Sequence, residues 1–166
     1  MASFTLKGTP FQTSGDLPRT GSFAPDFVMT KDDLTEIRLS DCQDKKVVLN
    51  IFPSLDTSTC AAAMKTFNQL AEKHKNVMFL CISADLPFAQ KRFCTAEHLN
   101  NVIPVSIFRN PAFGEHYGLL IQNGPLSGLL ARAVIVLDET GKIAYQELVS
   151  EITNEPNYRS AEAALA

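Results

Sequence analysis

The sequence predicts one α/β domain over residues 1–166, with a mixed central sheet, helices on both faces and a β-hairpin at the N-terminus. Three observations predict this class. Apolar runs of strand length alternate with segments whose apolar residues recur at helical spacing. The strand–helix–strand succession over 47–83 implies parallel strands joined by a right-handed crossover. Two strand-like segments flanking the turn at 138–141 add an antiparallel hairpin.

Length and composition suit an ordinary globular protein. The chain has 166 residues, of which 45% are apolar and 20% are charged. The net charge of −3 leaves no basic excess for neutralising phosphates, so nucleic acid is not an expected partner. No apolar run approaches the roughly 18 residues of a membrane span, and the N-terminus lacks the layout of a signal peptide. We therefore expect a cytoplasmic protein without membrane contact, with export to the periplasm by an unusual route left open.

The N-terminal part is predicted to hold a hairpin, a loop and one short strand. Residues 3–7 and 10–13 alternate around a Gly-Thr-Pro turn, which indicates the hairpin. Residues 14–31 are rich in Gly, Ser, Pro and Thr and are predicted to form a surface loop. Residues 34–39 alternate imperfectly and predict a short strand, followed by a polar turn over 41–46.

The centre of the chain holds the strand–helix–strand unit. The apolar run over 47–52 predicts a buried strand, and the run over 77–83 predicts a second one. Between them, apolar residues at helical spacing and terminal lysines indicate a helix from Thr57 to His74. A shorter helix over 85–94, capped by Asp85, follows the second strand.

The remaining elements are shorter, and their order completes the fold class. They are a strand over 102–108, a helix over 111–117, an apolar loop over 118–130, a strand over 133–137, its hairpin partner over 142–149 and a closing helix over 157–165. This order matches a thioredoxin-type arrangement, in which a reactive cysteine also follows the first βα junction.

The junction over 53–60 places Cys60 in the first turn of a helix, where unpaired backbone N–H groups favour a negative charge. An ordinary thiol, with a pKa of ~8.5, is only a few per cent thiolate at neutral pH. Lowering that pKa by ~2.5 units takes about 3.4 kcal/mol. A helix N-terminus supplies ~2 kcal/mol at best. A fixed cation is therefore required, and a guanidinium suits this role because it stays charged.

Two neighbours of the cysteine fit the same chemistry. The hydroxyl of Thr57, three residues before Cys60, can donate a hydrogen bond to the sulfur and accept one from a ligand. Pro53 lacks an N–H group and would shape and shield the pocket. A simpler interpretation stays open at this point, with Thr57 only an N-cap.

Several motifs together carry a family resemblance. The string PSLDTSTC fits the pattern Pro-x-x-x-Thr-x-x-Cys on Pro53, Thr57 and Cys60, and LLARAVIVLD places Arg132 at the entrance of a late strand. A second cysteine, Cys94, ends ADLPFAQKRFC. With VLNIFPS, FNQLA, LCISADLPFAQ and GLLARAV, the chain resembles the peroxiredoxin family, in its bacterial thiol peroxidase branch of atypical two-cysteine enzymes. The likeness runs over nearly the whole chain.

The resemblance implies a peroxidase that reduces hydrogen peroxide and organic hydroperoxides, with thioredoxin returning the electrons. It makes Cys60 the peroxidatic residue and Cys94 the resolving residue, joined by a disulfide within one chain, and it implies a homodimer. It also makes Arg132 the active-site arginine, which would supply the fixed cation beside the sulfur, and Thr57 an acceptor for the peroxide O–H group. The alternative for Arg132, a structural ion-pair residue, stays open. The resemblance implies no cofactor, and the three histidines share no ligand spacing that predicts a metal site. A disulfide needs Cα atoms ~4.4–6.8 Å apart, whereas packed helices lie ~8–10 Å apart. We therefore expect the Cys60 turn and helix 85–94 to unwind locally on oxidation.

The other cysteines and the apolar loop invite separate hypotheses. Cys81 lies inside an apolar strand and is predicted to serve packing. Cys42, in a polar turn, is predicted to be an exposed spectator, and Cys94 could itself be an inert core residue. The loop over 118–130 either packs in the core or at a dimer contact, or forms an apolar collar for alkyl hydroperoxides. The collar residues would be Leu126, Leu129 or Leu130.

Rival functions stay open beside the thioredoxin-dependent peroxidase. One is a thiol peroxidase that draws on glutathione or another donor. Another is a non-enzymatic thioredoxin-like module, either a redox sensor or a holdase, although such a surface would not need Thr57 and Arg132 around a thiol. A disulfide oxidoreductase is disfavoured because Cys60-Ala61-Ala62-Ala63 lacks the second thiol of a CxxC motif.

Overall fold

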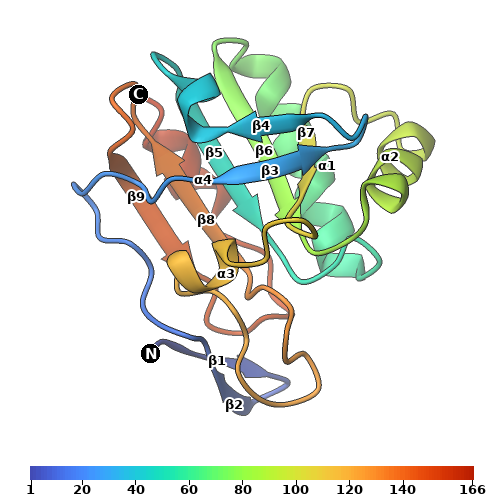
Figure 1. Cartoon of the computed structure of the whole chain (residues 1–166), viewed down its shortest axis with the longest axis vertical. Coiled ribbons are helices and arrows are strands. Elements are labelled where there is room, and N and C mark those ends of the chain that lie inside the picture. The colour runs from blue at the N-terminus through green and yellow to red at the C-terminus, as the bar shows by residue number, and fades with distance from the viewer.

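The computed structural model describes residues 1–166 and contains one seven-stranded sheet and a separate two-stranded sheet (Figure 1). The order in the large sheet is β4-β3-β7-β6-β5-β8-β9. The strands are β1 (Ser3–Leu6), β2 (Thr9–Gln12), β3 (Val28–Lys31), β4 (Glu36–Arg38), β5 (Lys46–Ile51), β6 (Val77–Ser83), β7 (Ile103–Ser106), β8 (Ala133–Leu137) and β9 (Ile143–Leu148). The helices are the 3-10 turn η1 (Leu39–Cys42), α1 (Ser58–Lys73), α2 (Pro87–Ala96), α3 (Phe113–His116) and α4 (Tyr158–Ala163).

The sheet is mixed, and its pairing determines which face each helix covers. β5 pairs in parallel with β6, and β6 with β7, whereas β8 and β9 run antiparallel beside β5. Because β5, β6 and β7 succeed one another in one direction across the sheet, right-handed crossovers place α1 and α2 on the same face. α4 joins them, since the ring of Tyr158 packs edge-on against that of Phe67 in α1, 5.2 Å apart. The short helix α3 contributes Phe113 to the core of the opposite face, and Figure 1 shows this helix beside β8. The predicted fold class is confirmed.

Two apolar cores lie on the two faces of the sheet because successive side chains of a strand point to opposite sides. In β5, Val48 belongs to the core under α1, while its neighbours Val47 and Leu49 belong to the other core. The α1 core also contains both Cys60 and Cys94. The site cysteines are thus part of the packed interior.

Three expectations about the N-terminal part need correction. The predicted loop over 14–31 ends in the strand β3, whose Met29 and Thr30 are fully buried between β4 and β7. A strand of only four residues beside a charged turn is too short to show its period in the sequence. The predicted polar turn begins within η1, and Cys42 at its end is 3% exposed. The expectation of an exposed Cys42 is wrong, because η1 turns this side chain into the larger core while Asp41 and Gln43 face solvent.

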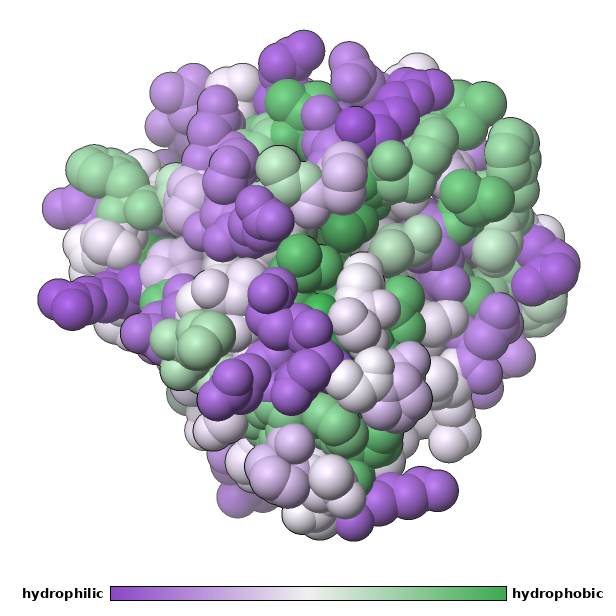
Figure 2. All heavy atoms as spheres, turned by 60° about the horizontal axis from the view of Figure 1, so that its bottom comes forward, coloured by the Kyte–Doolittle hydropathy of each residue, from purple (hydrophilic) through white to green (hydrophobic).

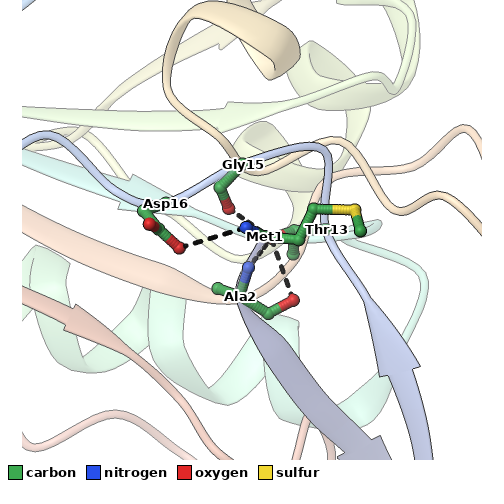
Figure 3. A network of polar contacts seen from close by, with 5 residues as sticks. All are labelled: Met1, Ala2, Thr13, Gly15 and Asp16. Atoms are coloured by element: carbon green, nitrogen blue, oxygen red, sulfur yellow. Dashed lines mark hydrogen bonds and ion pairs between the residues drawn. The ribbon is translucent and has the colours of Figure 1, made fainter.

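The N-terminal hairpin β1–β2 is confirmed, and its base is fastened to the following segment (Figure 3). The Ala2 N–H donates to the Gly15 carbonyl at 3.0 Å, and the Thr13 hydroxyl donates to the same carbonyl at 2.7 Å. The terminal amine of Met1 lies 3.5 Å from an oxygen of Asp16. These contacts hold the hairpin in place at the lower end of the molecule in Figure 1.

No helix in the structure combines the length and the apolar character that a membrane crossing requires.

Candidate active site

The pairing of β5 with β8 brings the predicted cysteine and arginine together. Ile51, at the end of β5, is opposite Ala133, at the start of β8. Cys60 follows β5 as the third residue of α1, and Arg132 immediately precedes β8, so both lie at the same end of the sheet. The Nη2 of Arg132 donates a hydrogen bond to the Cys60 Sγ at 3.2 Å.

This contact lies in the protein interior. Cys60 is 0% exposed and Arg132 is 3% exposed. A positive charge beside the sulfur favours the thiolate, and its effect is stronger here than in water because the surroundings screen it less. Burial opposes an anion at this position, so a Cys60 thiolate would depend on the guanidinium and the helix N-terminus.

One part of the Arg132 guanidinium is left free for a ligand. Its Nε donates to the Ile152 carbonyl at 2.8 Å, and its Nη2 binds the sulfur. Its Nη1 is buried and has no hydrogen-bond partner. Buried donors are rarely left unpaired, so an oxygen acceptor is expected there. Such an oxygen would lie against the guanidinium that also holds the sulfur.

A hollow of about 280 Å³ opens beside this pair. Its size is close to the lower limit of ligand pockets, about 300 Å³. Its lining includes Pro53, Thr57, Leu126, Leu129 and Arg132. Figure 2 turns this end of the molecule toward the viewer and shows apolar surface in the middle of the face, between hydrophilic side chains. The cavity is therefore partly apolar and reaches the guanidinium.

Two residues of interest are absent from that lining. Cys60 lies completely buried behind it, so the hollow ends short of the sulfur. Leu130 is also completely buried and packs in the larger core. The three leucines considered for an apolar collar are thus divided: Leu126 and Leu129 line the hollow, and Leu130 does not.

Comparison with known proteins decides the family. The redoxin family model matches residues 19–165. A thiol peroxidase of Mycobacterium tuberculosis is 52% identical over 165 residues, covering 99% of each chain. The chain belongs to the peroxiredoxins, in their thiol peroxidase branch. A thiol peroxidase of Corynebacterium glutamicum is 50% identical over the same length and coverage. A crystal structure of a peroxiredoxin-like protein from Aquifex aeolicus superposes with a TM-score of 0.93 at 41% identity, covering 98% of this chain and 95% of that one.

This peroxiredoxin is accordingly a thiol-dependent peroxidase, and the rest of the motif is placed around its hollow. Pro53 is buried next to the end of β5. Thr57 is the N-cap of α1 by its backbone, yet its side chain makes no capping bond and donates instead to the Ser54 carbonyl at 3.1 Å. The hydroxyl oxygen of Thr57 therefore keeps its lone pairs for an acceptor role at the hollow.

All four cysteines of this peroxiredoxin are free thiols. Cys94 is buried near the end of α2, in the core that also holds Cys60. Burial, and then the negative charge of Asp32, raises the pKa of Cys94 to about 11, so this thiol stays protonated at neutral pH. Cys81 is fully buried and accepts a bond from the Asn50 side chain at 3.6 Å, as expected for a packing residue. Burial raises its pKa to about 12.

Two carboxylates beside the site were not identified from the sequence as part of it. Asp85 was predicted to cap the second helix, but the N-cap of α2 is Leu86. The Asp85 carboxylate instead accepts bonds from the Ser54 hydroxyl at 2.8 Å and the Leu55 N–H at 2.9 Å, so it fastens the cysteine loop to the end of β6. Glu151 binds the hairpin and the loop after β9. Neither has a sequence signal, because an acidic residue in a polar stretch usually faces solvent.

No group of three or more His, Cys, Asp or Glu side chains in the structure is arranged to hold a metal ion.

Proposed function

We propose that this enzyme reduces hydrogen peroxide and organic hydroperoxides through the thiolate of Cys60. The observation that carries the proposal is the Arg132 guanidinium, which contacts the sulfur at 3.2 Å and keeps a second, unpartnered donor beside it. Such a fork can hold the nucleophile and a peroxide oxygen at the same time. Thr57 would accept the hydrogen bond of the peroxide O–H group, and Pro53 would limit the entry of water.

The proposed reaction consists of two successive thiol steps, the first at Cys60 and the second at Cys94. The Cys60 thiolate attacks the hydroxyl oxygen of the peroxide, so an S–O bond forms as the O–O bond breaks. The alkoxide leaves with the electron pair and takes up a proton, giving an alcohol, or water from hydrogen peroxide. The sulfenic acid left on Cys60 condenses with the thiol of Cys94, forming a disulfide and releasing water. The dithiol of thioredoxin then reduces this disulfide by exchange.

Resolution requires a change of conformation. Cys60 and Cys94 both lie in formed helices, α1 and α2, and are not bonded to each other. We therefore infer that the first turn of α1 and the end of α2 unwind before the disulfide forms. The separation that a disulfide tolerates, Cα atoms roughly 4.4–6.8 Å apart, sets how far the two segments must move.

The experiment that tests the function follows the loss of NADPH in the presence of thioredoxin, thioredoxin reductase and a hydroperoxide. We expect sustained consumption that depends on this protein and on thioredoxin. Consumption that persists without thioredoxin, or that requires glutathione, would assign another electron donor. Peroxide reduction that stops after a trace amount would favour a redox sensor.

The apolar part of the hollow is proposed to bind the organic group of alkyl hydroperoxides. Changing Leu129 to serine, or Leu126 to serine, should lower kcat/KM for cumene hydroperoxide by about tenfold, because apolar contact with the ring is lost. The rate with hydrogen peroxide should change little, since this substrate has no apolar group. Stopped-flow oxidation of the reduced enzyme measures both rates.

A matched control is Leu34→Ser. Leu34 is an exposed leucine in the turn between β3 and β4 and does not line the hollow. The Leu34→Ser variant should keep the wild-type oxidation rate with both peroxides. Equal losses for the two peroxides in Leu129→Ser would show that the leucine supports the site and does not select the substrate.

A homodimer and a cytoplasmic location complete the proposal. The observation that supports a dimer is the exposure of large apolar residues in α2 and after β7, among them Phe88 at 67% exposed and Phe108 at 41% exposed. Sedimentation equilibrium at micromolar concentration should yield twice the mass of one chain. The location rests on the sequence expectation and on the use of thioredoxin as reductant.

A further inference from the structure

The loop after β9 contacts Arg132 and Thr59, the residue that precedes Cys60. The Ile152 carbonyl accepts the Arg132 Nε–H at 2.8 Å. The Thr153 carbonyl accepts the Thr59 hydroxyl at 2.9 Å, and Thr59 immediately precedes Cys60 in the first turn of α1. Two successive carbonyls of this loop therefore act on the site: that of Ile152 orients the Arg132 guanidinium, and that of Thr153 holds the helix turn that carries Cys60.

This loop owes its position to the N-terminal hairpin. Residues 150–153 lie beyond the end of β9 and outside the large sheet. Thr5 of β1 donates its N–H to the Ser150 carbonyl at 2.7 Å and accepts the Ile152 N–H at 2.8 Å. Besides the bond from the Val149 N–H to the Arg132 carbonyl at 3.0 Å and the burial of the Ile152 side chain in the larger core, these two hairpin bonds hold the Ile152 carbonyl opposite Arg132.

The Glu151 carboxylate binds four donors at this junction. One oxygen accepts the Gly8 N–H and the Thr5 hydroxyl, each at 3.0 Å. The other accepts the Thr153 N–H at 3.1 Å and the Thr153 hydroxyl at 2.8 Å. All four donors are neutral, and Glu151 takes part in none of the ion pairs of the structure. The carboxylate thus links the hairpin to the loop residue whose carbonyl holds Thr59.

We propose that Glu151 is a positioning residue for the peroxidase reaction, because it holds the 150–153 loop in the place from which Ile152 aims Arg132 at the Cys60 sulfur. The inference rests on the roles proposed above for Cys60 and Arg132. Glu151 does not touch the sulfur or the hollow, so it acts only through its neighbours.

The charge on Glu151 is constant in the working range of the enzyme. The backbone N–H of Gly8, followed by the donors of Thr153, lowers the pKa of Glu151 from 4.5 to about 2. A carboxylate with a lowered pKa contributes stability that is present above the unfolded value and is lost as the pH falls toward the folded value. Glu151 therefore stays ionised above pH 5, and its effect on Cys60 should not vary with pH at neutrality.

The test compares Glu151→Gln with a matched control, Asp138→Asn. The amide keeps the size of the carboxylate but replaces one acceptor by a donor, which opposes the donors of either Gly8 or Thr153. Asp138 accepts the N–H and hydroxyl of Thr140 at 2.9 and 2.6 Å, in the turn at the far end of β8 from Arg132. Each variant thus loses a carboxylate that binds a threonine, and only the Glu151 carboxylate is proposed to support the site.

Two readouts follow the sulfur itself. One is the pH dependence of alkylation at the Cys60 peptide, quantified by mass spectrometry, which gives the midpoint of thiolate formation. The other is the stopped-flow rate of oxidation by hydrogen peroxide at pH 7. In Glu151→Gln the midpoint should rise and the rate should fall by roughly 10- to 100-fold, as expected for a displacement of about 1 Å. In Asp138→Asn both should stay at the wild-type value.

A double-variant cycle separates positioning from a general structural role. If Glu151 acts through Arg132, Glu151→Gln should add little to the loss already caused by Arg132→Met. Equal losses in the wild-type and Arg132→Met backgrounds, or wild-type values in Glu151→Gln alone, would overturn the inference and leave the proposed function intact. If Arg132→Met itself leaves midpoint and rate unchanged, the proposed roles of Cys60 and Arg132 fail, and the positioning role fails with them.

Discussion

Changing Cys60 to serine should abolish peroxide reduction, with a loss of at least about 10³-fold in the thioredoxin-coupled assay. A serine hydroxyl does not ionise near neutral pH and is a poor nucleophile toward an O–O bond. The fold should be retained, because serine is close in size to cysteine and its oxygen can accept the Arg132 Nη2–H that now binds the sulfur. Thermal unfolding of the variant should therefore resemble that of the wild type.

The matched control for this variant is Cys42→Ser. Cys42 is equally buried but packs in the other core, where its Sγ donates to the Arg38 carbonyl at 3.7 Å, a bond that a hydroxyl can replace. Its activity should equal that of the wild type. Measurable turnover in Cys60→Ser, with loss of turnover in Cys42→Ser, would contradict the assignment of Cys60 and make Cys42 the reactive thiol.

Changing Cys94 to serine should separate the two halves of the cycle. The reduced variant should consume one equivalent of peroxide per chain at the wild-type rate, since Arg132 and the first turn of α1 are untouched. Steady-state turnover with thioredoxin should then fall by about 100-fold or more, because the sulfenic acid on Cys60 has no partner thiol. A single-turnover burst followed by a flat NADPH trace is the expected record.

The pH dependence of the resolving step follows from the buried state of Cys94. Burial, with the nearby charge of Asp32, raises the pKa of Cys94 from 9.0 to about 11 in the folded protein. A thiol with a raised pKa contributes folded-state stability that is fully present below pH 9 and is lost as the pH rises toward 11. Because α2 must unwind before the disulfide forms, disulfide formation should accelerate across this window. Sustained cycling in Cys94→Ser at any of these pH values would assign the resolving role to another residue.

Where an apolar run is long, its place in the sheet could be predicted from the sequence. β6 (Val77–Ser83) and β8 (Ala133–Leu137) have the predicted bounds, because each is an uninterrupted apolar stretch buried on both sides. β3 (Val28–Lys31) was missed because its burial comes from pairing with β4 and β7, which are distant or short segments. Cys42 was misjudged for a related reason: a single inward-facing residue in a polar turn has no period to reveal it.

The pairing of Cys60 with Arg132 was predicted from the family resemblance together with chemistry. A thiolate at a helix N-terminus needs a cation, and the arginine at the entrance of a late strand could supply one. The contributions of Glu151 and Ile152 could not be predicted in this way. Ile152 acts through its backbone carbonyl, and the Glu151 carboxylate acts through the hairpin, with a contact to Gly8 that spans 143 positions of the sequence. Only the three-dimensional arrangement relates these residues to the sulfur.

The most direct test of the whole account is the titration of the Cys60 thiolate in the wild type and in Arg132→Met, followed by alkylation of the Cys60 peptide. The account predicts that the wild-type Cys60 reacts as a thiolate at neutral pH. Loss of the guanidinium should move the midpoint upward by about one to three pH units. A sulfur that is still protonated at neutral pH in the wild type, with a midpoint that Arg132→Met leaves unchanged, would contradict it.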